Sequence, residues 1–218
     1  NTWPDAAMTP FRGEKNTNWE GGWRVPSAVR WPGKIEAGSV SNEIMHHMDW
    51  LPTLLAAAGT DDIKERLKQG NVRSIGRKYK VHLDGYNFLP YLTGETDKGP
   101  RENFFYISDE GQVMAIRMGD WKAVFYEQRA HRFDVWREPL VPLRAPKIFN
   151  LRRDPFERAD TDANTYNEWW SDHAAQVYLS FAVAAQALQT FEEFPVRQKP
   201  DSWNLDKLVE MLQAGVRH

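Results

Sequence analysis

Three short β-prone runs follow one another over residues 103–108, 112–118 and 121–127, and their spacing constrains the fold more than any other feature. Two or three residues of the types Asp, Glu and Gly separate neighbouring runs. Connections this short join antiparallel strands, because parallel strands need a crossover of a dozen residues or more. Residues 147–151 can add a further strand before an Asp-Pro turn. The sequence therefore predicts a small antiparallel sheet built as a meander.

Helical patterns lie on both sides of this predicted sheet. In the first helix, Asp49 is the expected N-cap and Gly59 the expected stop. A β-prone stretch at residues 27–31 ends at Pro32-Gly33 and predicts a strand followed by a turn. The fold class is therefore α/β in the mixed α+β sense. The expected helices cover residues 49–58, 61–69, 165–194 (with an irregular start) and 205–212.

Composition excludes several classes of partner. The formal net charge is −2 and the basic residues are scattered, so we expect no nucleic-acid partner. The most apolar run, residues 174–188, contains polar side chains and is too short to span a bilayer, so we expect no membrane partner. The chain has no cysteine, which excludes disulfides, thiolate zinc sites and a cysteine nucleophile within these residues. Ten tryptophans favour a dense aromatic core.

Most catalytic signatures are absent from the sequence. It contains no Walker loop, no G-x-G-x-x-G, no G-x-S-x-G and no H-E-x-x-H. The densest histidine cluster, His46-His47 with Asp49, precedes a helix start, and loop and capping roles explain it better than a metal does. We therefore predict no metal site within this chain.

One loop stands apart from the rest of the chain. Lys15 lies in a Gly-, Asn- and Thr-rich stretch that continues into Glu20-Gly21-Gly22 and Arg24. The glycines permit a positive φ or a close approach of two backbones. Glu20 is placed to orient Lys15 or Arg24, and Arg24 is expected to be a structural ion-pair partner.

This stretch resembles the sulfatase family, in which a lysine is followed by a small residue, threonine, a threonine-like residue, an aromatic residue, then Glu-Gly-Gly and Arg-x-Pro. Several further stretches are similar to the same family and follow in the same order. The resemblance indicates the C-terminal portion of a bacterial arylsulfatase-like protein of the alkaline-phosphatase superfamily. The matching stretches are residues 9–26, 29–35, 48–55, 83–95, 115–122 and 149–157.

The resemblance implies an architecture and an activity. Residues 1–95 would form the end of the alkaline-phosphatase-like sulfatase domain, and residues 96–218 a C-terminal subdomain with a small antiparallel sheet and long helices. The intact polypeptide would hydrolyse sulfate monoesters, and its partners would be a small sulfate ester and the remainder of the sulfatase chain. Lys15 matches the family lysine that contacts the sulfate group.

The family's cofactors are Ca²⁺ and a formylglycine made from Cys or Ser in a C/S-x-P-x-R motif. This chain has no cysteine, and no serine in it is followed by x-Pro-x-Arg. We therefore expect both cofactors in the full-length enzyme, with neither bound by residues of this chain. The chain alone is predicted to have no sulfatase turnover.

Other residues have weaker assignments. Trp3 and Asp5 are predicted to line the mouth of the substrate site, because they lie close to where the family's metal ligands would be. A basic patch after the third predicted strand consists of Arg129, His131 and Arg132. It can contact an anionic substrate, or its charges can simply be solvated.

Two alternative functions remain open at this level. A phosphonate- or phosphate-ester hydrolase of the same superfamily would share the fold and an anion site, and relative rates on sulfate and phosphate esters separate it from a sulfatase. A non-catalytic binding module is the second alternative. It applies if the chain is a complete natural product without a nucleophile.

Overall fold

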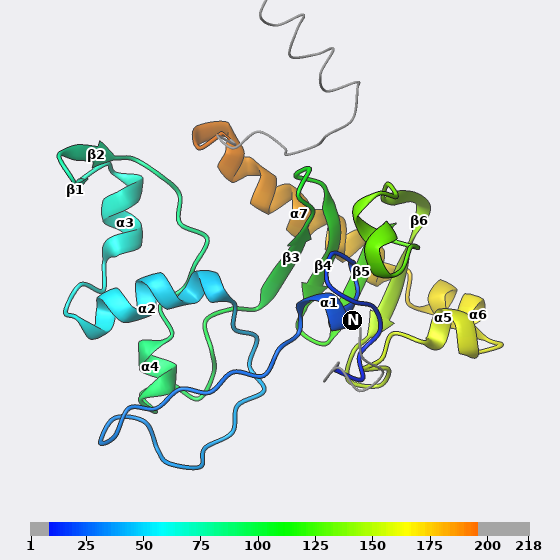
Figure 1. Cartoon of the computed structure of the whole chain (residues 1–218), viewed down its shortest axis with the longest axis horizontal. Helices are drawn as coiled ribbons and strands as arrows, with labels where there is room; N and C mark the ends of the chain where they lie inside the picture. The colour runs from blue at the N-terminus through cyan, green and yellow to red at the C-terminus, as the bar shows by residue number, and fades with distance from the viewer. Residues whose placement is uncertain (1–8, 196–218) are drawn as a thin grey trace, which may run out of the picture.

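A computed structural model describes residues 9–195, in which a four-stranded sheet and its helices form one side and a smaller helical group forms the other (Figure 1). The sheet is antiparallel with the strand order β3-β4-β5-β6, which confirms the predicted meander and its mixed fold class. Its strands are β3 (Asn103–Ile107), β4 (Val113–Met118), β5 (Trp121–Glu127) and β6 (Val141–Asn150).

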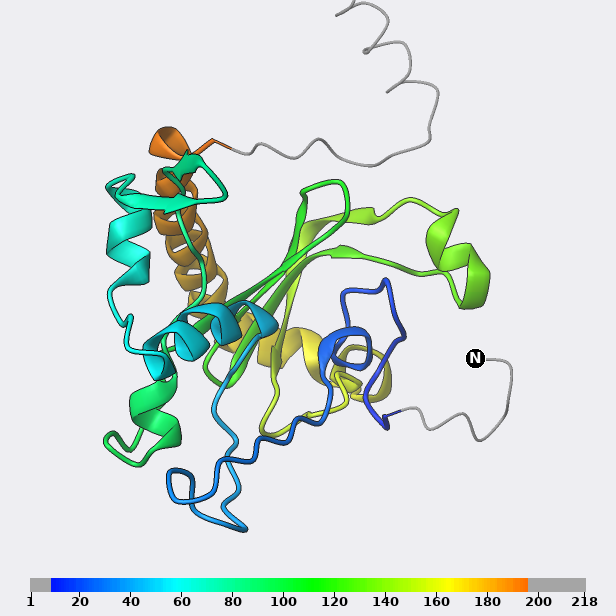
Figure 2. The ribbon, with the colours of Figure 1, turned by 60° about the vertical axis from the view of Figure 1, so that its left-hand side comes forward.

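The strand β6 is longer than the sequence predicted, and its register defines an unusual connection. Trp121 pairs with Asn150 at one end of the β5–β6 ladder, and Glu127 pairs with Val141 at the other. The connection between them, residues 128–140, contains the short 3₁₀ helix η2 (Arg132–Trp136). Figure 2 shows this connection projecting beyond the sheet, beside the N-terminal segment of the described chain.

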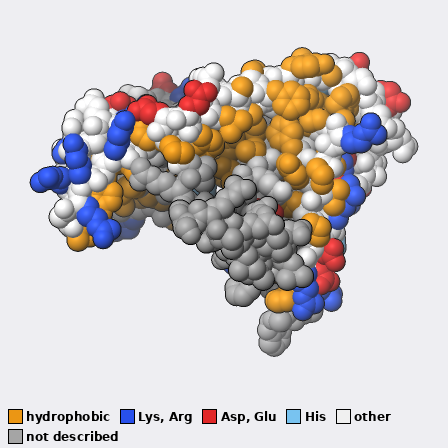
Figure 3. All heavy atoms as spheres, turned by 90° about the horizontal axis from the view of Figure 1, so that it is seen from above, with side chains coloured by type: hydrophobic (Ala, Val, Ile, Leu, Met, Phe, Trp, Pro, Cys, Tyr) orange, Lys and Arg blue, Asp and Glu red, His pale blue; other side chains and the backbone are white. Residues whose placement is uncertain are grey.

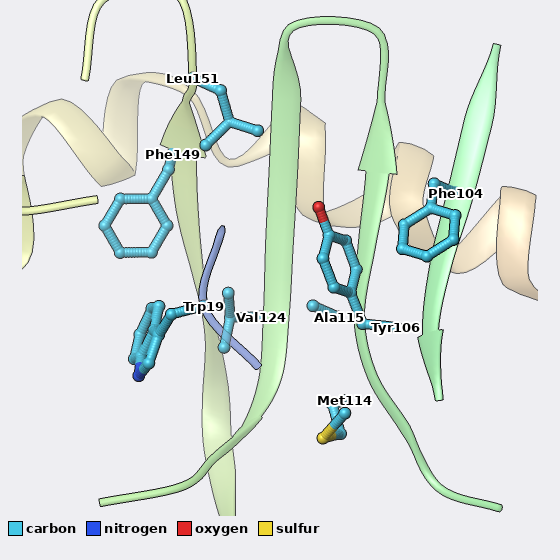
Figure 4. Packing of buried hydrophobic residues seen from close by; sticks show 8 residues of the cluster. All are labelled: Trp19, Phe104, Tyr106, Met114, Ala115, Val124, Phe149 and Leu151. Atoms are coloured by element: carbon cyan, nitrogen blue, oxygen red, sulfur yellow. The ribbon is translucent and has the colours of Figure 1, made fainter. Parts of the chain in front are cut away.

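The two faces of the sheet bury different parts of the chain, because successive side chains on a strand point to opposite sides. One face packs against the segment around Trp19 and against α1 (Glu20–Trp23). Trp19 meets Phe149 edge-to-face, with ring centroids 5.9 Å apart. Figure 4 shows the core on this face, which consists of Trp19, Phe104, Tyr106, Met114, Ala115, Val124, Phe149 and Leu151.

The opposite face is covered by α6 (Tyr166–Asp172) and α7 (Ala175–Glu193), which follow α5 (Ala159–Asp162). The single helix predicted over residues 165–194 is therefore two helices. They are separated at His173, whose ring bonds back to the Trp169 carbonyl at 2.7 Å and whose backbone leaves the helical region. Trp169 in turn stacks on Trp121 of β5, with centroids 5.7 Å apart. The break lets the tryptophans of α6 lie flat on the sheet while α7 crosses it.

The smaller helical group consists of helices and one hairpin. Asp49 stays in the 3₁₀ turn η1 (His47–Asp49) and makes no side-chain cap to the helix that follows, so the predicted capping role is wrong for that helix. The hairpin turns at Ile75 and Gly76, which both have positive φ, as a two-residue type I′ turn requires. The group contains α2 (Trp50–Ala57), α3 (Ile63–Lys68), β1 (Val72–Ser74), β2 (Arg77–Tyr79) and α4 (Leu89–Leu92).

The strand predicted at residues 27–31 is absent from the described structure, although the turn after it forms, with Lys34 N–H donating to the Trp31 carbonyl. Val25 and Val29 in this region are exposed. Within residues 9–195 no neighbouring strand pairs with the stretch, and a strand needs such a partner for its backbone groups.

Apolar side chains also remain in solvent on the helices. On α2, Leu51 and Leu54 are exposed while Thr53 and Ala56 are buried. On α7, Tyr178 and Leu188 are exposed, and Figure 3 shows apolar side chains gathered over one face of the molecule. No helix within the described range is both long enough and apolar enough to cross a bilayer. The helix predicted at residues 205–212 lies outside the described residues.

Candidate functional site

Lys15 lies at the tip of a tight loop, residues 12–17, here called the Lys15 loop. The backbone N–H and the hydroxyl of Thr17 both donate to the Glu14 carbonyl, at 3.1 and 2.6 Å. Asn16 takes a left-handed φ of +70°, which asparagine tolerates better than most residues. The turn is therefore closed by its own hydrogen bonds, and it leaves the Lys15 side chain in solvent.

Glycines allow this loop to lie directly on the start of α1. The Gly21 N–H donates to the Arg12 carbonyl at 2.7 Å. A Cβ built on Gly21 would lie 2.5 Å from that same oxygen, and one on Gly22 would lie 2.6 Å from the Glu14 carbonyl oxygen. Both approaches are closer than any side chain permits. The Glu-Gly-Gly sequence therefore serves close backbone contact, one of the two roles that the sequence predicted for it.

The β5–β6 connection holds the other side of the loop. Asn16 donates from Nδ2 to the Val135 carbonyl at 2.8 Å, and the Arg132 N–H donates to Glu14 Oε1 at 2.8 Å. The Lys15 ammonium lies 5.7 Å from the centroid of the Trp136 ring, within reach of a cation–π attraction. Two segments more than a hundred residues apart in the sequence thus fix the position of Lys15.

A buried charge network fixes the base of the loop to the sheet. Lys122 of β5 is fully buried and donates to the Asn18 carbonyl at 2.8 Å and to Glu20 Oε1 at 3.1 Å. Its ammonium also lies 2.7 Å from Glu157 Oε1. Glu157 closes the network by accepting from the Glu20 N–H at 2.7 Å, and the Tyr106 hydroxyl donates to Glu20. A buried ammonium with two carboxylates and several further hydrogen bonds is well compensated.

The two carboxyl groups of this network have pKa values shifted in opposite directions. Burial acts to raise the pKa of Glu20, but Lys122, the Tyr106 hydroxyl and Arg117 together bring it below its usual value. Burial raises the pKa of Glu157, and the negative charge of Glu20 adds to that rise. Glu157 is therefore the first of the pair to take a proton as the pH falls. Burial and the neighbouring Glu20 also raise the pKa of Tyr106 well above its usual value, so its hydroxyl remains a donor.

A second set of ion pairs supports the loop where it meets β6. The Arg12 guanidinium donates to the Glu157 carbonyl at 2.7 Å and to Asp160 at 2.8 Å, and it lies 3.6 Å from the centroid of the Trp19 ring. Lys147 of β6 bridges Asp160 and Glu127. A cavity of about 250 Å³ opens between this set and the β5–β6 connection. It is lined by Arg12, Gly13, Thr17, Trp19, Glu127, Gln128, Arg129, Ala130, His131 and Lys147.

Family models match two stretches of this chain. A family model described as sulfatase matches residues 5–60, and one described as the C-terminal region of aryl-sulfatase matches residues 99–201. This chain belongs to the sulfatase family. It is 36% identical to human arylsulfatase A over 154 residues, which cover 66% of this chain and 27% of that protein. It is 37% identical to an arylsulfatase of the sea urchin Hemicentrotus pulcherrimus, covering 70% of this chain and 28% of that protein.

A solved sulfatase shares the fold. The crystal structure of the PsFucS1 sulfatase from Pseudoalteromonas sp. superposes with a TM-score of 0.70 at 28% identity, covering 90% of this chain and 36% of the other. The sulfatase-like chain described here therefore spans about a quarter of the length of the curated relatives that it matches, and about a third of this solved one.

The structure describes some of the residues singled out from the sequence and not others. Lys15 lies on a firmly held loop, and the patch of Arg129, His131 and Arg132 lies beside that loop, at the cavity and the start of η2. Trp3 and Asp5 lie outside the described residues. The roles of all these residues in binding substrate stay predictions.

Two expectations about this loop are wrong. Glu20 orients neither Lys15 nor the Arg24 side chain, because it is buried and paired with Lys122. Arg24 forms no ion pair within the described part of the chain, and its guanidinium lies 4.5 Å from the centroid of the Phe11 ring instead. The sequence missed Lys122 and Glu157 as partners of Glu20. The available signal was a lysine at the strand position that shares a face with Val124, where an unpaired charge would be very costly.

The cluster at His46, His47 and Asp49 also has a structural explanation. The Asp49 carboxylate is fully buried and accepts from the Arg101 guanidinium at 2.9 and 2.5 Å, as well as from the His46 and Tyr86 N–H groups. It ties the small helical group to the residues just before β3.

Residues 9–195, the part of the chain that the structure describes, do not provide a site for the cofactors of the sulfatase family. Between residues 9 and 195 no three His, Asp or Glu side chains come together in a way that could hold a metal ion. The chain also has no cysteine from which a formylglycine could be made. Neither Ca²⁺ nor formylglycine is therefore assigned to residues of this chain.

Proposed function

We propose that this chain acts as the C-terminal part of a hydrolase of sulfate monoesters, in which Lys15 binds the sulfate group. The observation that carries the proposal is the position of Lys15 in the sulfatase motif, at the exposed tip of a loop held from three sides. The structure offers an ammonium that is free to reach a ligand while its backbone is fixed. Such a group need not be reorganised when charge develops on a substrate.

The chemistry of a sulfate ester suits this ammonium. Cleavage spreads negative charge over the sulfuryl oxygens and the leaving oxygen, and a lysine is a compact point charge that can stabilise either. The partners of this chain would be a small sulfate ester and the remainder of a sulfatase chain. That remainder would supply the nucleophile and the family's Ca²⁺. Trp3 and Asp5 are proposed to line the entrance to the same site.

The first measurement is to read the complete reading frame that encodes this chain. A C/S-x-P-x-R motif upstream of Asn1 supports the proposal, whereas a start codon directly at Asn1 favours a binding module. The polypeptide encoded by the whole frame is then assayed on 4-nitrophenyl sulfate and 4-nitrophenyl phosphate. A preference for the phosphate ester would assign the alternative activity, and the chain of residues 1–218 alone should release no sulfate.

Substituting Lys15 tests its role directly. In the full polypeptide, Lys15→Ala should lower kcat for 4-nitrophenyl sulfate by about 10²- to 10³-fold, the effect of losing one preorganised donor at a developing anion. Lys78→Ala is the matched control, because Lys78 is an exposed lysine on the distant β1–β2 hairpin. If both variants keep their activity, Lys15 does not contact the reacting sulfate.

A further inference from the structure

Two large aromatic side chains lie in solvent on the short helix η2, beside Lys15. Phe133 is 65% exposed and Trp136 is 53% exposed, although they share one helical turn and flank the buried Val135. Single exposed apolar residues are ordinary on protein surfaces. Two aromatic rings on one turn next to the motif lysine form a surface with a defined position.

That position is fixed rather than adjustable. Val135 is buried, and its carbonyl accepts from Asn16 at 2.8 Å and from Gln128 Nε2 at 3.2 Å. Gln128 also donates to the Glu138 carbonyl at 2.9 Å, which closes the connection across its base. The helix and the Lys15 loop are thus held to each other by direct hydrogen bonds, so the fold fixes the separation of the Trp136 and Lys15 backbones.

The distance has a chemical consequence. The Lys15 ammonium lies 5.7 Å from the centroid of the Trp136 ring. A sulfate that binds this ammonium carries its ester oxygen and the attached carbon only one or two bonds further on. A ring attached to that oxygen therefore falls within stacking or edge contact of Trp136, where aromatic pairs meet at centroid distances of roughly 4.5–7 Å.

We propose that Trp136, with Phe133 beside it, is a specificity determinant that contacts the ring of the leaving group of a sulfate ester bound at Lys15. The inference rests on the proposed function of Lys15 and names the side chain of this chain that meets the leaving group at the same site. Arg137 lies 4.7 Å from the centroid of the Phe133 ring and orients that side chain.

The test compares two substrates on the polypeptide encoded by the whole reading frame. One is 4-nitrophenyl sulfate, which carries a ring, and the other is methyl sulfate, which has none. Trp136→Ala should raise KM for 4-nitrophenyl sulfate roughly 2- to 10-fold, the size of one aromatic contact, with little change in kcat. KM for methyl sulfate should stay unchanged. Trp136→Phe should leave KM for 4-nitrophenyl sulfate close to the wild-type value, because a phenyl ring still offers a face.

Tyr178→Ala on α7 is the matched control, since Tyr178 is an aromatic residue 74% exposed on the opposite side of the sheet. An equal fall in kcat on both substrates would overturn the inference, because Trp136 would then act only by orienting Lys15. Unchanged kinetics in Trp136→Ala would also overturn it. A wild-type polypeptide without activity on either ester contradicts the proposed function itself, and the inference then fails with it.

Discussion

Two consecutive segments of this chain differ sharply in how far they are buried. Residues 10–23 contain the Lys15 loop and α1, and Asn18, Trp19 and Glu20 there are almost fully buried. Residues 24–45 contain the predicted strand, yet Val25 and Val40 there are 62% and 88% exposed. The first segment finds partners on the sheet for its rings and its charges. The second finds no strand to pair with among residues 9–195, which shows that β-prone sequence alone does not make a strand.

The largest expected effect is a loss of stability on replacing a tryptophan of the first segment, compared with replacing one of the second. Trp19 is buried against Phe149 and Arg12, whereas Trp31 is 36% exposed. Trp19→Ala should lower the free energy of unfolding by roughly 3–5 kcal/mol, because it empties a core position. Trp31→Ala should lower it by less than about 1 kcal/mol. Urea titration followed by circular dichroism measures both values, and equal losses would mean that residues 24–45 are packed in solution.

A smaller effect separates close contact from backbone strain. Gly21→Ala places a methyl group 2.5 Å from the Arg12 carbonyl oxygen, which cannot rotate away, and should cost roughly 1–3 kcal/mol through overpacking. Gly38→Ala, in the exposed segment, meets no atom within 4 Å and should cost only the roughly 1–2 kcal/mol of a left-handed φ. Thermal unfolding of the two variants shows which of them is less stable. A less stable Gly38 variant would contradict the close packing of the Lys15 loop.

The smallest effect is a dependence of stability on pH that arises from the buried carboxyl groups of Glu20, in the first segment, and of Glu157, its partner. The folded-state pKa of Glu157 is raised, so stability is lost as the pH rises from the unfolded value, near 4.5, through the raised value. The folded-state pKa of Glu20 is lowered, so stability is lost as the pH falls from that unfolded value through the lowered one. Stability should therefore be greatest where Glu157 is protonated and Glu20 is ionised.

Glu157→Gln tests the first of these two contributions, the loss of stability as the pH rises. The amide does not titrate, but its single oxygen can serve only one of the two donors that Glu157 binds with separate oxygens, Lys122 at Oε1 and the Glu20 N–H at Oε2. The free energy of unfolding of this variant should lack the loss that the wild type shows above about pH 4.5. A variant with the same slope as the wild type would show that another group is responsible. Glu36→Gln, in the segment 24–45, is the control.

The sequence predicted what is local in this fold. The meander follows from runs separated by two or three turn residues, and the turn at Pro32-Gly33 formed where the sequence placed it. The long C-terminal helix was predicted as one piece, because nothing in its periodicity reveals that His173 bonds back to a carbonyl. The family was recognisable from collinear motifs, which carry more information than any single residue.

The sequence could not predict what depends on distant partners. Glu20 has Lys15 and Arg24 as its nearest cations in sequence, but it pairs with Lys122, 102 residues away. Burial decides this, because a carboxylate removed from water must be matched by a charge at the same depth. The contact of Lys15 with Trp136 was hidden for the same reason. It depends on the β5–β6 register, which places η2 beside the loop.

The network around Lys122 also sets the order in which the chain can mature on the ribosome. Glu20 leaves the ribosome before its partners Lys122 and Glu157, which follow 102 and 137 residues later. At roughly 5–20 residues per second, the Lys15 loop waits for about ten seconds before its anchors exist. The loop that carries the motif lysine is thus made before the residues that anchor it to the sheet.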